Sequence, residues 1–484
     1  MSLDIARSLR WSYGGMAANL VLQVAFAALA ARLVSAESYG MAAVATGLVS
    51  YLSYLSDLGV GLLAVRNRDL DAADLWGVAL VGLAGNLVIV AAVWLAAPSV
   101  AAFVGFSGEG VWVLRALSLL APLGGLNTAA LAWLNREMDF RALAIMSLVG
   151  KLVGQGAVTL PLAWAGWGVW ALVAGALGQV AAGLAIALWR QPPRLPRRSR
   201  WPAIGAALRV GVNFSLIRLL DSTQAQMIPL SAATLMGAGA AGLFDRGALL
   251  TLVALELITA GAGRVLLPVY GRMGEEERGR IPQAFLSACR RVLCLVLPLA
   301  AGVAAAAEPL VLTVFGGGWS ALVEPLRLLA VLAGLRSVAM LAGGLVEAQG
   351  GLYHNMMQRI CVLVLLLSWI CVVRPTELGW LLAGAVLAEG ASALALLALA
   401  SRAAGLAFAA VLVPPLLALS VALPVGGVMA LAAGADGSPG YRLVLTMLCG
   451  GICLGGVLLL HPHSGLRGEV RRMVRHAFAG NVSL

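Results

Sequence analysis

The sequence predicts an all-α polytopic membrane protein with fourteen transmembrane helices. Hydrophobic residues make up 61% of the 484 residues, and a soluble domain of this composition could not cover itself with polar surface. Nearly every apolar stretch is also long enough to cross about 30 Å of hydrocarbon. The predicted spans are 11–33, 41–65, 75–97, 111–134, 142–164, 167–189, 205–229, 243–267, 283–307, 322–346, 356–374, 378–400, 408–433 and 442–460.

Arginine gathers on one side of the predicted membrane. If the N-terminus is cytoplasmic, the outer segments carry only Arg32, Arg374 and Arg442. The inner segments carry Arg7, Arg10, Arg66, Arg68, Arg136, Arg141, Arg190, Arg194, Arg197, Arg198, Arg200, Arg272, Arg278, Arg280, Arg359, Arg402, Arg467, Arg471, Arg472 and Arg475. This asymmetry follows the positive-inside rule, so both termini are expected in the cytoplasm. The inner arginines also account for the net charge of +11, so no nucleic-acid partner is expected.

The first six spans form a predicted N-terminal lobe, residues 1–189. Arg7 and Arg10 lead directly into the first span without a small-residue cleavage site, so this span is expected to act as its own membrane signal. The fifth and sixth spans are separated by little more than Ala165 and Gly166. A membrane enzyme acting on an outward substrate would need larger outer loops with carboxylates or histidine, so transport is favoured over catalysis.

Residues 190–202 are predicted to link two lobes on the cytoplasmic side. The stretch from Gln191 to Pro202 holds four prolines and four arginines. Proline at this density excludes a helix, and the arginines favour the lipid head groups. A second six-helix lobe is predicted over residues 203–400.

The second lobe repeats a signature of the first. Pro98 and Gly105 follow the third span, and Pro309 and Gly316 follow the ninth span at the same spacing, 211 residues later. Six spans separate the two copies, and an even number of spans preserves orientation. The lobes are therefore predicted to be parallel six-helix bundles.

Two further segments follow the second bundle. Residues 401–461 contain the thirteenth and fourteenth spans, which lie outside the repeat. Residues 462–484 place apolar side chains at helical spacing with four arginines between them, which is typical of an amphipathic helix at the membrane surface. This tail is expected on the cytoplasmic side.

Cysteine and histidine form no metal or catalytic motif in this sequence. All six cysteines lie inside predicted spans, and Cys449 and Cys453 share one helix face. No histidine or carboxylate lies near that pair in the sequence, so apolar packing is the favoured role. We therefore expect no metal, no cofactor and no catalytic residues.

Ionisable side chains inside spans are the candidates for function, because each costs about 2.5–3.5 kcal/mol at a helix centre. Lys151 lies near the middle of the fifth span and Arg218 near the middle of the seventh. Basic groups in an embedded cavity suit an anionic substrate, since phosphate needs charge-assisted donors where water is scarce. Arg246 and Arg264 lie near helix ends, where snorkelling is the competing interpretation. The acidic candidates for a coupling ion are Asp57, Asp221, Glu256 and Glu389.

Seven short motifs occur in one order along the chain. They are Ala31-Arg-Leu-Val-Ser-Ala-Glu-Ser-Tyr-Gly40, Ser56-Asp-Leu-Gly-Val-Gly61, Leu134-Asn-Arg-Glu-Met-Asp-Phe-Arg141, Gly166-Trp-Gly-Val-Trp-Ala-Leu-Val-Ala-Gly175, Gly242-Leu-Phe-Asp-Arg246, Arg264-Val-Leu-Leu-Pro268, and Glu308-Pro-Leu-Val311 with Trp319. In combination they resemble Wzx-type oligosaccharide flippases, the lipopolysaccharide and exopolysaccharide exporter branch of the MOP superfamily, over about residues 5–350.

The resemblance implies a MATE-like, two-lobed flippase in the bacterial inner membrane. Such a protein moves a lipid-linked oligosaccharide from the inner to the outer leaflet by alternating access. The family pattern marks Arg246 and Arg264 as recurrent positions, and it gives the deep groups Lys151 and Arg218 the role of holding pyrophosphate. The implied partners are the lipid-linked oligosaccharide, membrane lipids and, as a candidate, a polysaccharide polymerase complex.

The seventh span departs from the family pattern. The branch carries an acidic residue nine positions before the glycine matched by Gly237, and this chain has Ile228 there, followed by Pro229. Asp221 lies two turns earlier and is a candidate substitute. Because proline removes a backbone hydrogen bond, Pro229 is expected to break the helix near its outer end.

Three alternative functions stay open at this point. A lipid II flippase shares the general architecture, although its local sequence pattern fits less well. A MATE-type drug or cation antiporter would need an acidic cavity rather than a basic one. A membrane scaffold that transports nothing would leave the charges inside the spans without a role.

Overall fold

The computed structural model describes residues 2–56, 72–137, 139–190, 192, 219, 222–251, 255, 258–259 and 281–460. Within these ranges every regular element is a helix. Eleven helical segments are long and apolar enough to cross a membrane. The other three predicted spans, 41–65, 205–229 and 243–267, each include residues outside the described ranges. The all-α membrane class is thus confirmed, and the count of fourteen stays a prediction.

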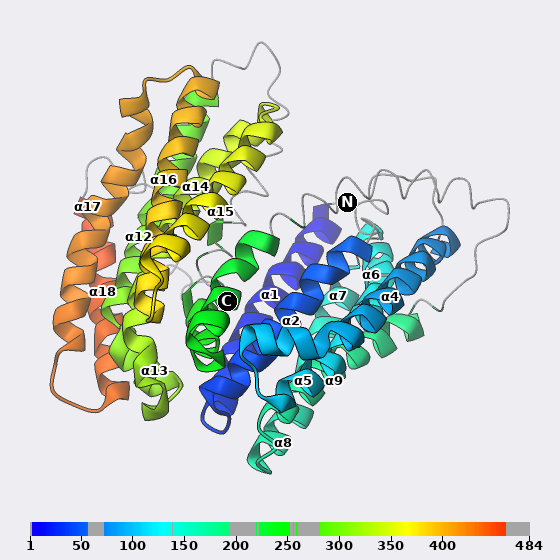
Figure 1. Cartoon of the computed structure of the whole chain (residues 1–484). Coiled ribbons are helices and arrows are strands. Elements are labelled where there is room, and N and C mark those ends of the chain that lie inside the picture. Colours follow the sequence, from blue (N-terminus) through cyan, green and yellow to red (C-terminus); the bar gives the residue numbers. More distant parts are fainter. Residues whose placement is uncertain are drawn as a thin grey trace, which may run out of the picture. The chain divides into compact units, whose positions relative to one another are not determined.

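The chain divides into two compact units, of which the first is Met1–Asp245. Its helices are α1 (Ser2–Ala31), α2 (Ala36–Ser56), α4 (Ala72–Val104), α5 (Gly108–Ser118), α6 (Leu120–Arg136), α7 (Phe140–Lys151), the π-helix η1 (Leu152–Thr159), α8 (Leu160–Trp164) and α9 (Val169–Arg190) (Figure 1). Residues 222–236 and 238–251 are also helical. One buried cluster joins α2, α4, α5 and α9 with Ala238.

The second unit is Arg246–Leu484. Its helices are α12 (Ile281–Ala305), α13 (Ala307–Val314), the 3₁₀-helix η4 (Gly317–Leu322), α14 (Val323–Ala348), α15 (Leu352–Val373), α16 (Leu378–Ala404), α17 (Phe408–Ala433) and α18 (Pro439–Leu460) (Figure 1). The largest buried cluster of this unit joins α12, α14, α16 and α17. The predicted thirteenth span and α17 have the same bounds. The linker 190–202, apart from residue 192, and the tail 462–484 lie outside the described residues.

The two Pro-to-Gly segments both end in a glycine with positive φ. Gly105 follows α4 with φ +76, and Gly316 lies two residues after α13 with φ +92. Only glycine adopts this left-handed region without a Cβ penalty. In both segments, Pro98–Gly105 and Pro309–Gly316, a helix is thus followed within two residues by a glycine with positive φ.

The expected helix break at Pro229 is wrong. The helix continues over 222–236 and ends at Gly237, whose φ of +90 stops it. Proline removes one backbone donor, but spanning helices tolerate that loss because neighbouring groups satisfy the freed carbonyl. The same tolerance is visible in α4, α12 and α17, which all contain internal proline.

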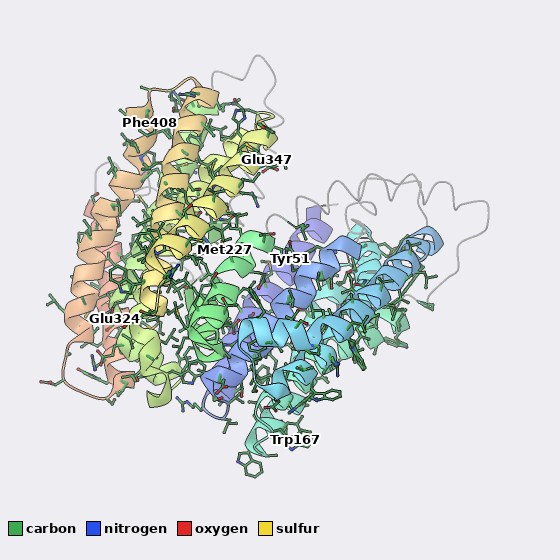
Figure 2. All side chains as sticks on the ribbon, in the orientation of Figure 1. Tyr51, Trp167, Met227, Glu324, Glu347 and Phe408 are labelled. Atoms are coloured by element: carbon green, nitrogen blue, oxygen red, sulfur yellow. The ribbon has the colours of Figure 1, made fainter. Side chains whose placement is uncertain are left out.

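Exposed tryptophans mark one membrane interface of the first unit. Trp164 ends α8, and Trp167 projects from the turn that follows it (Figure 2). In the last turn of α5, the guanidinium of Arg115 lies 5.0 Å from the ring centroid of Trp112 and 5.8 Å from that of Trp94. Amphipathic rings favour the head-group level. Trp164 and Trp167 thus indicate a head-group level at the end of the segment Arg141–Trp164.

Two glycines allow α2 to approach the 238–251 helix closely. A Cβ atom at Gly40 would lie 1.7 Å from the carbonyl oxygen of Ala238, and one at Gly242 would lie 1.9 Å from that of Ala36. Spanning helices associate through such close backbone packing, because lipid offers no hydrophobic driving force between them. Tyr51 of α2 (Figure 2) contacts the preceding helix, 222–236, because the hydroxyl of Thr223 donates to that of Tyr51 at 3.4 Å.

We predict that Gly242→Ala will destabilise the protein by about 1–3 kcal/mol, because the new methyl group overlaps backbone that cannot move freely. Gly239→Ala is the matched control, since a Cβ atom there meets nothing within 4 Å. The measurement is the thermal denaturation midpoint of the purified variants in detergent. Equal midpoints for the two variants would contradict the close packing.

Candidate functional site

Lys151 lies deep in the membrane-spanning part of the first unit. It is the last residue of α7, inside the segment Arg141–Trp164, and only 7% of it is exposed. Ten residues separate it from Arg141, which corresponds to about 15 Å along a helix. Since the hydrocarbon is about 30 Å thick, Lys151 lies near mid-depth, where snorkelling to either surface is difficult.

Among the described residues, both partners of the Lys151 ammonium group are neutral. Its Nζ donates to the backbone oxygen of Asn19 at 3.1 Å and to Oε1 of Gln23 at 3.3 Å, both on α1. No described carboxylate lies within ion-pair distance of it. An ammonium group has three N–H donors, so one remains for a ligand. A buried charge of this kind is retained where it meets an opposite charge.

Glycine packing on the opposite side directs Lys151 toward α1. A Cβ atom at Gly150 would lie 2.9 Å from the carbonyl oxygen of Gln179, and one at Gly154 would lie 2.5 Å from that of Gly175. The small residues at positions 150 and 154 form the spacing that lets spanning helices touch. They seat α7 and η1 on α9, so the adjacent Lys151 faces away from α9.

The π-helix η1 begins directly after Lys151 and runs from Leu152 to Thr159. Thr159 donates its hydroxyl hydrogen to the carbonyl oxygen of Gly154, five residues earlier, at 3.0 Å. Gln155 of the same segment donates from Nε2 to Oε1 of Gln179 on α9 at 3.4 Å. Segments of π-helix are rare and occur frequently at functional sites. Sequence reasoning missed η1, because apolar periodicity does not distinguish it from an α-helix.

A second deep charge cluster lies in the second unit, on α14, α15 and α16. Nε of Arg336 lies 3.9 Å from Oε2 of Glu389, and Arg359 interacts electrostatically with the same carboxylate. Glu389 is buried, with 5% exposed. Sequence reasoning did not consider Arg336 and counted Arg359 with an inner connection. The sequence signal that could have identified this cluster is Arg336, an arginine at the centre of the tenth predicted span.

Amide and hydroxyl groups surround this second cluster. Gln358 donates from Nε2 to the hydroxyl of Ser392, and Asn355 donates from Nδ2 to the carbonyl oxygen of Gly343 at 3.2 Å. Each of these pairs connects α15 to a neighbouring helix. The cluster thus joins three spanning helices through polar contacts, which are rare inside a bilayer.

The structure describes three of the eight candidate residues, namely Lys151, Arg246 and Glu389. Arg246 is half-buried in the 238–251 helix and has interaction partners. The other five lie outside the described residues: Asp57, Arg218, Asp221, Glu256 and Arg264. In the described part of the chain, all six cysteines are free, and no group of His, Cys, Asp or Glu is placed to hold a metal ion.

Comparison with known sequences gives one family and a relative with a transport role in its name. A family model described as "Polysaccharide biosynthesis protein" matches residues 29–324. The succinoglycan biosynthesis transport protein ExoT of Rhizobium meliloti (strain 1021) is 26% identical over 333 residues, which are 68% of this chain. The match covers 66% of that relative, just under two thirds of its length.

Solved structures of low sequence identity share the fold. The lipid II flippase MurJ in an inward closed conformation aligns with a TM-score of 0.69 and 12% identity, over 93% of this chain and 97% of that one. An inward-facing MATE family multidrug resistance transporter of the MOP superfamily aligns with a TM-score of 0.61 and 21% identity, over 80% and 95%. The predicted MOP-like fold is confirmed at this level.

We predict that Glu389→Gln will lower the stability of the protein, because the change leaves Arg336 and Arg359 without their shared counter-ion. Breaking a buried ion pair from one side costs roughly 3–5 kcal/mol, and the 3.9 Å separation places this pair at or below that range. Glu389→Asp, which keeps the charge, should lose less. Thermal denaturation in detergent measures both variants. A Glu389→Gln variant of wild-type stability that no longer transports would instead favour the coupling-ion role predicted from the sequence.

Proposed function

The chain belongs to the polysaccharide biosynthesis protein family, and from this premise we propose that it is a flippase of the bacterial inner membrane. Its substrate is an oligosaccharide linked to a polyprenyl pyrophosphate, which it translocates by alternating access for export of a cell-surface polysaccharide. The family match and the relative with 26% identity confirm the resemblance to Wzx-type exporters. The name of that relative, a transport protein of succinoglycan biosynthesis, supports transport rather than catalysis.

The depth and the partners of Lys151 are the observation from which we propose the class of substrate. Its ammonium group lies at mid-depth, and within the described part of the chain it contacts two neutral oxygens and keeps one donor available. The cost of holding such a charge in the bilayer is offset when it binds an anion. A pyrophosphate is the charged part of a polyprenyl-linked sugar, and charge-assisted hydrogen bonds to phosphate are among the strong ones. Arg218, Arg246 and Arg264 are proposed as further substrate-binding residues.

The architecture proposed for this function has fourteen helices. Two parallel six-helix bundles cover residues 1–189 and 203–400, the cytoplasmic linker 190–202 joins them, and residues 401–461 add two helices. The tail 462–484 lies on the cytoplasmic surface with both termini. The glycines with positive φ that end the two Pro-to-Gly segments support the repeat, and the arginine asymmetry supports the orientation.

The neighbours of Lys151 and Glu389 also help to distinguish between the alternative functions. A drug or cation antiporter would need an accessible carboxylate, whereas Lys151 has no described acidic neighbour and Glu389 lies beside two arginines. For this reason Asp57, Asp221 and Glu256 are the better proposals for a coupling ion. A polymerase complex is proposed as a partner, since the exported repeat units must be joined after translocation.

We predict that Lys151→Gln will reduce export at least tenfold while membrane abundance stays near normal. A hydrogen bond to a charged group contributes about 1.5–3 kcal/mol, which corresponds to about ten- to hundredfold in binding. Lys151→Arg, which keeps the charge, should retain part of the activity. The measurement is leaflet-resolved quantification of labelled lipid-linked sugar in cells with matched protein levels.

Gln23→Glu supplies an independent test of the charge itself. Its new carboxylate would lie where Oε1 of Gln23 now accepts from Lys151 at 3.3 Å, so an internal ion pair would replace the ligand. Export should fall as in Lys151→Gln, although Lys151 is unchanged, and Gln23→Met should impair export less. Export at the wild-type level from both Lys151→Gln and Gln23→Glu would overturn the cationic site.

A further inference from the structure

Two glutamines close to Lys151 have hydrogen-bonding groups without protein partners. Gln155 and Gln179 share one hydrogen bond of 3.4 Å between η1 and α9. A carboxamide offers two N–H donors and an oxygen that accepts two hydrogen bonds. In the ranges that the structure describes, the second N–H and the oxygen of Gln155 and both N–H groups of Gln179 have no partner. Both side chains are partly buried.

Such groups are unusual inside a bilayer. A carboxamide removed from water without compensating hydrogen bonds is costly, and hydrocarbon supplies none. A third amide continues the row, because a Cβ atom at Gly183, one turn beyond Gln179 on α9, would lie 3.9 Å from Nδ2 of Asn127 on α6. Oδ1 of Asn127 is buried without a partner. The row therefore fits a polar ligand that both donates and accepts hydrogen bonds.

The chemistry of the amides distinguishes between a phosphate and a sugar. An ionised phosphate only accepts hydrogen bonds, so the free acceptor oxygens of Gln155 and Asn127 do not suit it. Sugar hydroxyls donate and accept, as carboxamides do. The row carries no charge, which suits an uncharged sugar. The amides are thus complementary to a neighbouring pair of hydroxyl groups.

We propose that Gln155 and Gln179 form a subsite for the hydroxyl groups of the first, uncharged sugar of the lipid-linked substrate. This inference rests on the proposed function, in which Lys151 binds the pyrophosphate. Gln155 lies four residues after Lys151, in the π-helix that begins directly after the lysine, so both residues belong to one short segment of the helix. In the substrate the first sugar ring is bonded directly to the pyrophosphate, so the two subsites contact adjacent chemical groups.

A purely structural role for the glutamine pair makes a different prediction. An interhelical hydrogen bond can simply hold η1 against α9, where Gly150 and Gly154 already provide close packing. In that case, removal of either amide would change stability without affecting the choice of ligand. The decisive readout is therefore the preference between two lipid probes rather than the total amount of binding.

The test uses the purified full chain in detergent and two probes, polyprenyl pyrophosphate and polyprenyl pyrophosphate that carries one neutral hexose. Native mass spectrometry gives the Kd of each. The wild-type protein should bind the hexose probe about fivefold more tightly, as one or two net hydrogen bonds allow. Gln155→Leu and Gln179→Leu should each abolish this preference and leave the Kd of the bare pyrophosphate unchanged. If a leucine variant folds poorly, Gln155→Met or Gln179→Met replaces it in the same measurement.

Two controls separate this proposal from the proposed function. Gln358→Leu removes an amide of the second unit that already has Ser392 as its partner, and it should keep the wild-type preference. Lys151→Gln should weaken both probes equally. A wild-type preference in both glutamine variants, or equal weakening of both probes by them, would overturn the sugar subsite alone. Failure of the wild-type protein to bind either probe would overturn the proposed function as well.

Discussion

Hydrocarbon offers no hydrogen-bonding partner, and this constraint determines which polar groups the spanning helices can carry. Most polar side chains here satisfy it inside the protein. Thr251, Thr259 and Ser337, for example, donate to the carbonyl oxygen four residues earlier. Glu389 satisfies it through arginines of two neighbouring helices. Lys151 differs from Glu389, because the described partners of its charge are neutral oxygens. The proposed substrate-binding site is based on this charge.

Close helix packing fixes the position of Lys151. Glycines at positions 150 and 154 bring α7 and η1 onto the backbone of α9, and α1 supplies the two oxygens that Lys151 contacts on the other side. The lysine is therefore fixed between two helices rather than free to extend toward a surface. The π-helix that follows presents Gln155 to α9 within the same segment. One short stretch of sequence thus positions a charge and an amide pair.

The sequence predicted the membrane class and most span positions well, because apolar length and arginine asymmetry are strong physical signals. The position of Lys151 near the middle of a span was predicted from the same apolar lengths. What composition could not predict was pairing across helices, such as Arg336 with Glu389, because this depends on which faces meet. The helix break was assigned to Pro229 rather than to Gly237, since a spanning helix tolerates proline more readily than a soluble one.

The central claim is that this chain moves a pyrophosphate-linked sugar between leaflets. The most direct measurement uses the purified protein reconstituted into liposomes with a fluorescent polyprenyl pyrophosphate that carries a single hexose. A membrane-impermeant quencher then reports the fraction of probe in each leaflet over time. The account predicts transbilayer movement well above that of protein-free liposomes, and none for a fluorescent polyprenol without phosphate. Movement no faster than in protein-free liposomes, with or without an imposed ion gradient, would contradict it.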